Sequence, residues 1–265
     1  MSACADEFLY RALPSFPFPL SVLFHVIMKK ESFKIFRKGN GGRDMKFEYY
    51  GHAAFVLDTG KERLLFDPFL SGNASAAIRA EDVRCDYILL SHAHSDHFGD
   101  ADAIAARTGA TVIAIPEVLG LFEKSPSASP MNIGGTAVFP FGRVTMTPAF
   151  HSSGVAGGMA CGFLLRFTGG PVVYYSGDTG IFGDMALIGK KAPIDYAILP
   201  IGDNYTMGSE DAVAAAKLLG AHSVIPIHYN TWPVIAQDPE KLAALAEEIG
   251  VNPCIVRVGA SLTLV

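Results

Sequence analysis

The sequence predicts an α/β protein in which two strand-rich halves each carry helices. Short runs of β-branched and aromatic residues recur along most of the chain, and the last third alternates strand-like with helix-like segments. The composition includes 27 Gly and 16 Pro, which supply many short turns. Half of the 265 residues are hydrophobic, so the chain can bury a large core, and a single folded domain is expected.

The first 44 residues do not share this pattern. Residues 8–28 are apolar but broken by an arginine and three prolines, and residues 29–39 form a basic run. Asp6 and Glu7 stand where a secretory signal is positively charged, and the uninterrupted apolar part is too short for a membrane span. We therefore expect residues 1–44 to form a loosely ordered N-terminal extension, without stable membrane insertion, and residues 45–265 to form the folded domain. A weak membrane-surface anchor in the extension is the alternative.

From residue 45 onward the pattern turns to β-structure. Apolar and β-branched runs predict strands, in chain order, at residues 46–50, 52–58, 63–66, 82–90, 111–115, 136–139, 143–150, 161–168 and 171–176. Helices are expected at 100–107, where Gly109 ends the helix, and at 117–123. Residues 124–135 are rich in Ser, Pro and Gly, which predicts a loop.

The last third predicts strands at residues 196–200, 223–227, 254–258 and 261–264. The helix expected at 209–219 begins with Ser209 as its N-cap, because a hydroxyl can accept a bond from a free backbone N–H. The helix expected at 239–249 has Asp238 as its cap and a proline at its first position. Glycines follow both helices and end them.

The densest group of chemically active side chains lies in residues 91–100, Ser-His-Ala-His-Ser-Asp-His-Phe-Gly-Asp. Three imidazoles and a carboxylate follow an apolar run at 87–90, which predicts a buried strand, and precede a helix expected from Gly99 onward. In this pattern His92 and His94 can face one metal ion while Asp96 and His97 turn toward a second. The alternative is a surface loop without metal, but such crowding is unusual in a chain with eight His.

Three further ligand-type residues each follow a predicted strand. They are His151 after 143–150, Asp178 after 171–176 and His228 after 223–227. Side chains at the ends of successive strands converge on one edge of a sheet, so these residues can complete two metal sites.

These motifs resemble the metallo-β-lactamase superfamily in its usual order. The resemblance rests on the 91–97 cluster, His151, Gly-Asp-Thr at 177–179 and Pro-Ile-His at 226–228, and it covers residues 45–265. It implies a four-layer αββα sandwich with the metals at one sheet edge, and a hydrolase domain at 45–265. The leading 44 residues have no counterpart in that pattern.

Further motifs at 51–55, 177–179, 200–208 and 228–231 resemble the small uncharacterised metal-dependent hydrolases related to ascorbate-6-phosphate lactonase. The chain lacks the inserted RNA-binding domain of the superfamily's nucleases. It also lacks the C-terminal helical domain of glyoxalase II.

The resemblance implies a role for each ligand. His92, His94 and His151 are expected to hold the first metal ion, and Asp96, His97 and His228 the second, with Asp178 bridging both. Asp96 and Asp178 are the expected catalytic carboxylates. Two such ions lower the pKa of a bridging water to ~7 and so generate hydroxide at neutral pH. Zinc is the expected metal, and Mn, Fe or Ni also fit a sphere of His and Asp ligands.

Substrate contacts are predicted for six residues near these motifs: His52, Asp203, Asn204, Thr206, Tyr229 and Asn230. For His52 a hydrogen-bonded strand histidine is an equal alternative. Asp67 either orients a ligand histidine or caps the turn before Pro68. His222 and His25 are interpreted as structural or surface residues.

The expected function is a dinuclear metal-dependent hydrolase acting on a small ester, lactone or phosphodiester. Phosphodiesterase or nuclease activity is the alternative among enzymes, and a non-catalytic metal-binding protein on the same scaffold is the alternative outside them. A net charge of −5 and a pI of about 5.9 give no footprint for nucleic acid. Four scattered Cys without a Cys-x-x-Cys pair indicate a reducing, cytoplasmic location. Homo-oligomerisation is left open, and a flavodiiron-like oxidoreductase would need a flavin domain for which the chain has no room.

Overall fold

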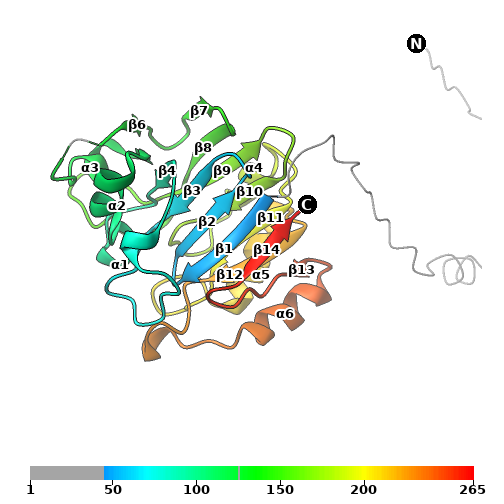
Figure 1. Cartoon of the computed structure of the whole chain (residues 1–265). Coiled ribbons are helices and arrows are strands. Elements are labelled where there is room, and N and C mark those ends of the chain that lie inside the picture. Colours follow the sequence, from blue (N-terminus) through cyan, green and yellow to red (C-terminus); the bar gives the residue numbers. More distant parts are fainter. Residues whose placement is uncertain (1–44, 125) are drawn as a thin grey trace, which may run out of the picture. The chain divides into compact units, whose positions relative to one another are not determined.

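The structure is a computed structural model that describes residues 45–124 and 126–265 (Figure 1). The expectations for residues 1–44 lie outside the described residues. Within the described ranges, no helix has the length and apolar character needed to cross a membrane.

The first sheet is mixed and has seven strands in the described part of the chain. Strands β14, β1, β2 and β3 are antiparallel neighbours, whereas β3, β4, β5 and β6 run parallel. In spatial order the strands are β14 (Ser261–Leu264), β1 (Met45–Gly51), β2 (Ala54–Asp58), β3 (Arg63–Phe66), β4 (Tyr87–Leu89), β5 (Thr111–Ala114) and β6 (Ala128–Pro130).

The second sheet, also of seven strands among the described residues, is mixed in the same way. Strands β13, β12, β11 and β10 are parallel, and β10, β9, β8 and β7 are antiparallel. In spatial order the strands are β13 (Asn252–Pro253), β12 (Ser223–Ile227), β11 (Tyr196–Pro200), β10 (Val172–Tyr175), β9 (Cys161–Phe167), β8 (Gly142–Pro148) and β7 (Thr136–Phe139).

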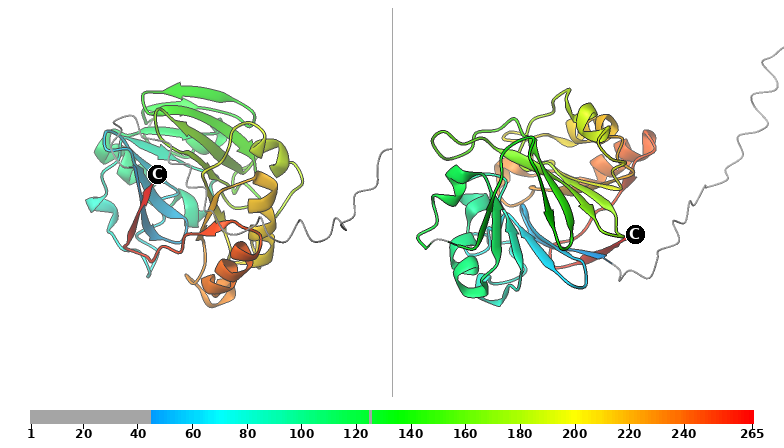
Figure 2. Two further views of the ribbon diagram at one scale, coloured as in Figure 1. Left: turned by 90° about the vertical axis from the view of Figure 1, so that its right-hand side faces the viewer. Right: turned by 90° about the horizontal axis from the view of Figure 1, so that it is seen from above.

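Helices cover the outer face of each sheet, which gives the predicted four layers (Figure 2). Beside the first sheet lie η1 (Ala80–Asp82), α1 (Ser95–Phe98), α2 (Ala101–Thr108) and α3 (Pro116–Leu119). Beside the second lie α4 (Met185–Gly189), α5 (Ser209–Leu219) and α6 (Pro239–Glu248), while η2 (Pro233–Ile235) follows β12. The αββα prediction is confirmed.

Alternation along the strands explains why two cores form. In β11, Ile198 packs between the sheets, whereas Ala197 and Leu199 face the core beneath α4, α5 and α6. In β10, Tyr175 likewise packs between the sheets, and Tyr174 faces the core beneath the helices. Successive side chains of a strand point to opposite faces, so strands covered on both sides read as continuous apolar runs.

Several sequence-based boundaries are wrong for identifiable reasons. The predicted loop 124–135 contains β6, a three-residue strand with Pro130 at its end that pairs only with β5. The predicted strand 254–258 does not form, because this stretch leaves β13 of the second sheet to reach β14 of the first. The predicted strand 82–90 is reduced to β4.

Helix predictions also need correction. Ser209 is the first helical residue of α5 rather than its cap, and Gly208 occupies the cap position without a side-chain bond. Asp238 caps α6 as predicted, since its carboxylate accepts from Glu240 N at 3.0 Å. Helix α4 was not predicted, and it is only five residues long.

Candidate metal centre

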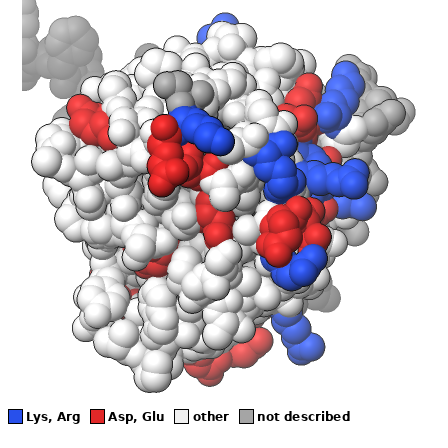
Figure 3. Space-filling model, turned by 60° about the vertical axis from the view of Figure 1, so that its left-hand side comes forward, with Lys and Arg blue, Asp and Glu red and all other residues white. Residues whose placement is uncertain are grey.

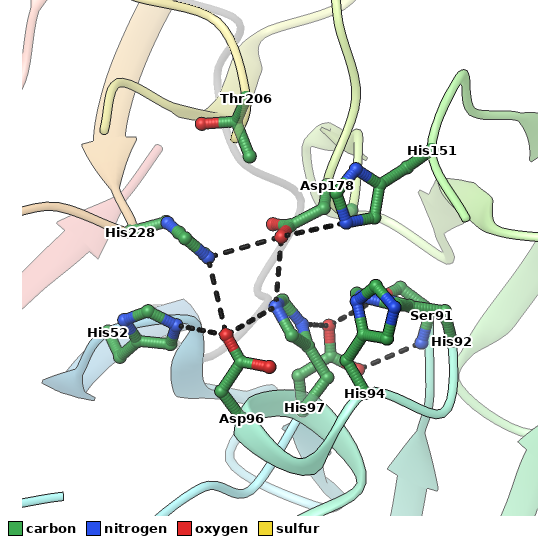
Figure 4. Close-up of polar contacts among 12 residues, drawn as sticks. His52, Ser91, His92, His94, Asp96, His97, His151, Asp178, Thr206 and His228 are labelled. Atoms are coloured by element: carbon green, nitrogen blue, oxygen red, sulfur yellow. Dashed lines mark hydrogen bonds and ion pairs between the residues drawn. The ribbon is translucent and has the colours of Figure 1, made fainter. Parts of the chain in front are cut away.

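The seven predicted metal ligands come together at one edge of the two sheets (Figure 4). The 92–97 cluster follows β4, and Asp96 and His97 lie on α1. His151, Asp178 and His228 follow β8, β10 and β12, which run in the same direction because β9 is antiparallel to both of its neighbours. The strand directions therefore place these side chains at a common edge.

Close packing of backbone joins the two sheets at this edge. Ala93 N donates to Ser153 O at 2.7 Å, and Cys161 N donates to Ser91 O at 3.0 Å. Gly177, at φ +61°, allows the loop that carries Asp178 to approach, because a Cβ there would lie 2.5 Å from Cys161 O and 2.8 Å from Ser91 Cβ. The ligand loops are thus held against each other by main-chain geometry.

The first cluster contains three imidazoles, those of His92, His94 and His151, whose ligand atoms all lie within 4.8 Å of one another. His92 Nε2 is 3.0 Å from His94 Nδ1. The other nitrogens of these two rings contact hydroxyls: His92 Nδ1 is 2.9 Å from Ser91 Oγ, and His94 Nε2 is 3.2 Å from Ser152 Oγ. This arrangement leaves one nitrogen of each ring to face a common point.

The second cluster contains Asp96, His97 and His228, joined by His52. Asp96 Oδ2 lies 3.8 Å from His228 Nε2 and 4.0 Å from His97 Nε2. Asp178 Oδ2 lies 3.1 Å from His228 Nε2, 3.2 Å from His97 Nε2 and 3.7 Å from His151 Nε2. One carboxylate oxygen is therefore close to residues of both clusters.

Asp67 is fully buried and orients His97. Its Oδ2 lies 2.8 Å from His97 Nδ1, and the carboxylate also accepts from Ser91 N and from the hydroxyls of Ser91 and Tyr175. Asp67, His92 and His97 also offer ligand atoms within 4.8 Å of one another, but the Asp67 oxygens are already occupied by these donors. The contact with Asp67 keeps a proton on His97 Nδ1 and turns Nε2 toward the cluster.

His52 is buried beside the second cluster rather than in the interior of a strand. Its Nε2 lies 3.2 Å from Asp96 Oδ2, and its Nδ1 lies 2.8 Å from Thr231 Oγ1. His52 O also accepts from His228 N at 2.8 Å, which ties the turn after β1 to the ligand loop after β12. Both ring nitrogens of His52 therefore contact other side chains at the edge of the cluster.

Strained backbone is concentrated around the centre. Among the described residues other than glycine, six have a positive φ, and each is a site residue or follows a strand that ends there: His52, Asp67, Asp203, Asn204, His228 and Asn230. Such conformations are unfavourable for residues with a Cβ and persist where the surrounding structure holds them, most often at functional sites.

Burial and charge set the protonation of the buried groups in the metal-free chain. Burial lowers the pKa of His92 well below its usual range and lowers the pKa of His52 to about 4, although Asp96 raises the latter. Burial alone would raise the pKa of Asp178, but the rings of His228 and His97 hold it well below its usual range. Neutral imidazoles and an ionised carboxylate are the forms that bind metal.

The pKa of His97 shifts the other way. Burial alone would lower it, but the carboxylates of Asp178 and Asp67 raise it well above the usual range for histidine. In the metal-free chain the ring therefore carries a proton on both nitrogens. A cation bound at Nε2 would replace the proton on that nitrogen.

The surroundings of two buried ring nitrogens indicate whether metal ions fit this centre. Among the described residues, His97 Nε2 and His228 Nε2 are buried, and each has its short contact with the same carboxylate oxygen, Asp178 Oδ2, at 3.2 and 3.1 Å. A bound divalent cation would accept the lone pairs of both nitrogens and keep the Asp178 carboxylate paired with a positive charge. The potential ligands around these atoms are imidazoles and carboxylates, and the thiol of the buried Cys161 faces the carbonyls of Leu90 and Ser91 instead. The residues present fit divalent metal ions.

A pocket of about 290 Å³ opens onto the centre. Its lining combines five of the predicted ligands with three other residues: His94, Asp96, His151, Asp178 and His228, with Ser152, Tyr205 and Trp232. None of the six predicted substrate residues lines this pocket, although Thr206 lies beside the cluster in Figure 4. Those six assignments stay predictions.

The surroundings of the substrate candidates explain their positions. Tyr229 packs against the core under α5 and α6, and Asn230 Oδ1 accepts from Gln237 N at 2.8 Å to shape the following turn. The residues that sequence reasoning missed are Tyr205, Trp232 and Thr231. Tyr205 lies inside the 200–208 motif, Thr231 is the last residue of the 228–231 motif, and Trp232 directly follows it. These positions were the signal that could have indicated the three residues.

Comparison with known proteins gives consistent matches. The family model described as "Beta-lactamase superfamily domain" matches residues 62–229. A "UPF0173 metal-dependent hydrolase" of Natranaerobius thermophilus is 47% identical over 213 residues, which are 80% of this chain and 96% of the relative. The Bacillus subtilis protein "UPF0173 metal-dependent hydrolase YtkL" is 46% identical over 210 residues, 75% of this chain and 92% of the relative.

Solved structures agree. Igni18, described as a metallo hydrolase from Ignicoccus hospitalis, is 35% identical with a TM-score of 0.78, covering 84% of this chain and 99% of its own. CmlA from Streptomyces venezuelae, described as a diiron β-hydroxylase, is 17% identical with a TM-score of 0.66, covering 84% of this chain and 54% of its own. The second match shows a shared fold alone.

Proposed function

The chain belongs to the beta-lactamase superfamily and is a metal-dependent hydrolase, and from this premise we propose that it binds two divalent ions and hydrolyses a small ester, lactone or phosphodiester. The observation that supports the proposal most is the position of Asp178 Oδ2, within 3.7 Å of ring nitrogens from both imidazole clusters. A carboxylate in that position can be shared by two ions.

We assign His92, His94 and His151 to the first ion, and Asp96, His97 and His228 to the second, with Asp178 shared. Zinc is favoured, and Mn, Fe or Ni fit the same donors. When bound, such a pair supplies hydroxide at neutral pH and polarises the oxygen of the scissile group. The negative charge of Asp178 would offset the repulsion between two bound cations, and Asp96, which lines the pocket, would help to hold the second one.

Two alternatives remain less favoured. A nuclease would need a basic surface, yet Arg63 pairs with Glu48 and Asp58, and Arg79 pairs with Asp82. On the face in Figure 3, Lys and Arg are interleaved with Asp and Glu at one side, and a broad area carries neither. A non-catalytic metal-binding role does not account for the pocket that opens onto the ligands.

We further propose that residues 45–265 form the hydrolase domain and that the protein works in the cytoplasm. The location is supported by Cys85, Cys161 and Cys254, which are free and at least half-buried.

The proposed function is tested by a hydrolysis screen with the full chain. Lactones, carboxylic esters, thioesters and bis(p-nitrophenyl) phosphate are assayed before and after chelation and after divalent metal is restored. We expect turnover of at least one class that disappears with chelator and returns with metal. Turnover of none, or undiminished turnover by protein shown to be metal-free, would contradict the proposal.

His52 and Thr231 are proposed to position Asp96. An ionised Asp96 carboxylate can only accept, so His52 Nε2–H donates to Asp96 Oδ2 and the Thr231 hydroxyl would then donate to His52 Nδ1. Because His52 contacts Thr231 through one ring nitrogen and an oxygen of the assigned ligand Asp96 through the other, we interpret His52 as a residue that orients that ligand. His52→Ala is expected to weaken binding of the second ion by about 10–100-fold and to leave the first unchanged.

Calorimetric titration of stripped protein with zinc measures the two affinities separately. His52→Gln, which retains an N–H donor, is expected to recover part of the loss, and Thr231→Val to cause a smaller one. His222→Gln is the matched control, since His222 is exposed. Equal weakening of both ions by His52→Ala would count against the positioning role.

A further inference from the structure

We propose that the part of the substrate remote from the scissile bond is a flat, uncharged, apolar group, held between Tyr205 and Trp232. This inference rests on the proposed function, because it names the substrate class of the same site. It follows from what lines the pocket once the predicted ligands are set aside.

Outside the ligands, the lining consists of Ser152, Tyr205 and Trp232. Ser152 Oγ lies 3.2 Å from His94 Nε2, so its hydroxyl already contacts a ligand ring. The two aromatic side chains are therefore the surfaces left to contact the remainder of a substrate. Aromatic faces bind flat apolar groups well, because stacking adds to the gain from burying apolar area.

Both aromatic residues sit on loops with a defined conformation. In the loop of Tyr205, Asp203 N donates to Met207 O at 2.9 Å and Thr206 N donates to Asp203 O at 2.7 Å. The Trp232 ring lies 4.9 Å from the His52 ring and 6.0 Å from the Phe69 ring, between centroids. Asn204 and Asn230 have positive φ angles, a turn conformation that asparagine adopts more readily than most residues.

Tyr205 and Trp232 are nevertheless open to solvent, with 57% and 37% of their surfaces exposed. Burial of such rings by a bound apolar group would be favourable, since it removes apolar surface from water. The pocket volume of about 290 Å³ is enough for a substituent the size of a benzyl group beside the scissile bond.

The charge of the residues that line the pocket also favours an uncharged substrate group. Of the described residues that line the pocket, none is Lys or Arg. A phosphate monoester or carboxylate remote from the metals would therefore lack the cationic partner that such groups need when desolvated. A phosphorylated sugar lactone, which the likeness to ascorbate-6-phosphate lactonase would imply, is disfavoured for this reason.

The protein provides its own probe, because Trp232 is the sole tryptophan in the sequence. Fluorescence of the metal-loaded full chain is titrated with N-benzylacetamide, the amide counterpart of benzyl acetate. Two comparison ligands are N-methylacetamide, which lacks the ring, and 4-(acetamidomethyl)benzenesulfonate, which adds a charge that is a poor metal ligand. We expect saturable binding of N-benzylacetamide, and binding at least about tenfold weaker for both comparison ligands.

Substitutions of the two aromatic residues show whether these residues bind the ligand. Tyr205→Ala keeps the fluorophore and is expected to weaken N-benzylacetamide about tenfold. Trp232→Ala is expected to raise KM for benzyl acetate without a matching loss of kcat, as for a contact made equally in ground and transition states. Val138→Ala, at an exposed position of β7 away from the pocket, is the control and should change neither.

The outcomes separate the two proposals. If the sulfonate binds as tightly as N-benzylacetamide, or if Tyr205→Ala has no effect, the inference is overturned. If no substrate class is hydrolysed in the screen, the proposed function fails instead, whatever the fluorescence titration shows about the pocket.

Discussion

Asp178→Ala is expected to empty both metal positions and to lower hydrolysis by at least about a hundredfold. The reason is that Asp178 Oδ2 lies near His97 and His228 on one side and His151 on the other. Its removal takes a ligand from each ion and also the negative charge between them. Native mass spectrometry of the metal-loaded variant gives the number of ions per chain.

Two single-site variants give the comparison that this prediction needs. His92→Ala should mainly weaken the first ion, and His228→Ala mainly the second. Asp178→Ala should therefore lose at least as much metal and activity as either. Asp211→Ala, an exposed carboxylate of α5, is the control. Two ions per chain and near-normal activity in Asp178→Ala would show that the carboxylate is not shared.

Asp67→Ala is expected to destabilise the metal-free fold by about 3–5 kcal/mol, because it removes one partner of a buried ion pair. The carboxylates of Asp178 and Asp67 together raise the pKa of His97 well above its usual range, so the variant leaves Nδ1 of this ring without its charged partner. It also leaves Ser91 N and the hydroxyls of Ser91 and Tyr175 without this acceptor. Urea unfolding followed by circular dichroism measures the change in the free energy of unfolding.

Tyr175→Phe is the matched control for this prediction. It removes one donor to Asp67 and keeps the ring that packs against Phe55 and Phe66. A cost of about 1 kcal/mol is expected for one hydrogen bond. If Asp67→Ala costs no more than Tyr175→Phe, the buried pair contributes little to the fold.

The predicted ligands could be placed from sequence because their information is local. His92 to His97 form one short stretch after an apolar run, and His151, Asp178 and His228 each follow a strand whose residues are apolar. Strand ends converge at a sheet edge, so the type and order of these residues were enough to predict a common site. The two mixed sheets, by contrast, were predicted through the family resemblance rather than from packing.

Other features depend on contacts that no local pattern records. His52 and Thr231 are 179 residues apart, and nothing around either residue indicates that their side chains meet. Tyr205 and Trp232 lie on irregular loops, where no periodicity tells which side chains face a pocket. Residues 254–258 carry a strand-like pattern, yet they cross between sheets and have no partner strand there.

The central claim is that this centre works with two ions, and titration of the stripped full chain with zinc tests it most directly. Hydrolysis of the best substrate from the screen is measured after each addition, together with bound metal per chain. We expect activity to rise until two zinc ions are bound per chain and then to stay constant. Full activity with a single bound ion, or activity before any zinc is added, would contradict the shared role of Asp178 and the assignment of the second ion.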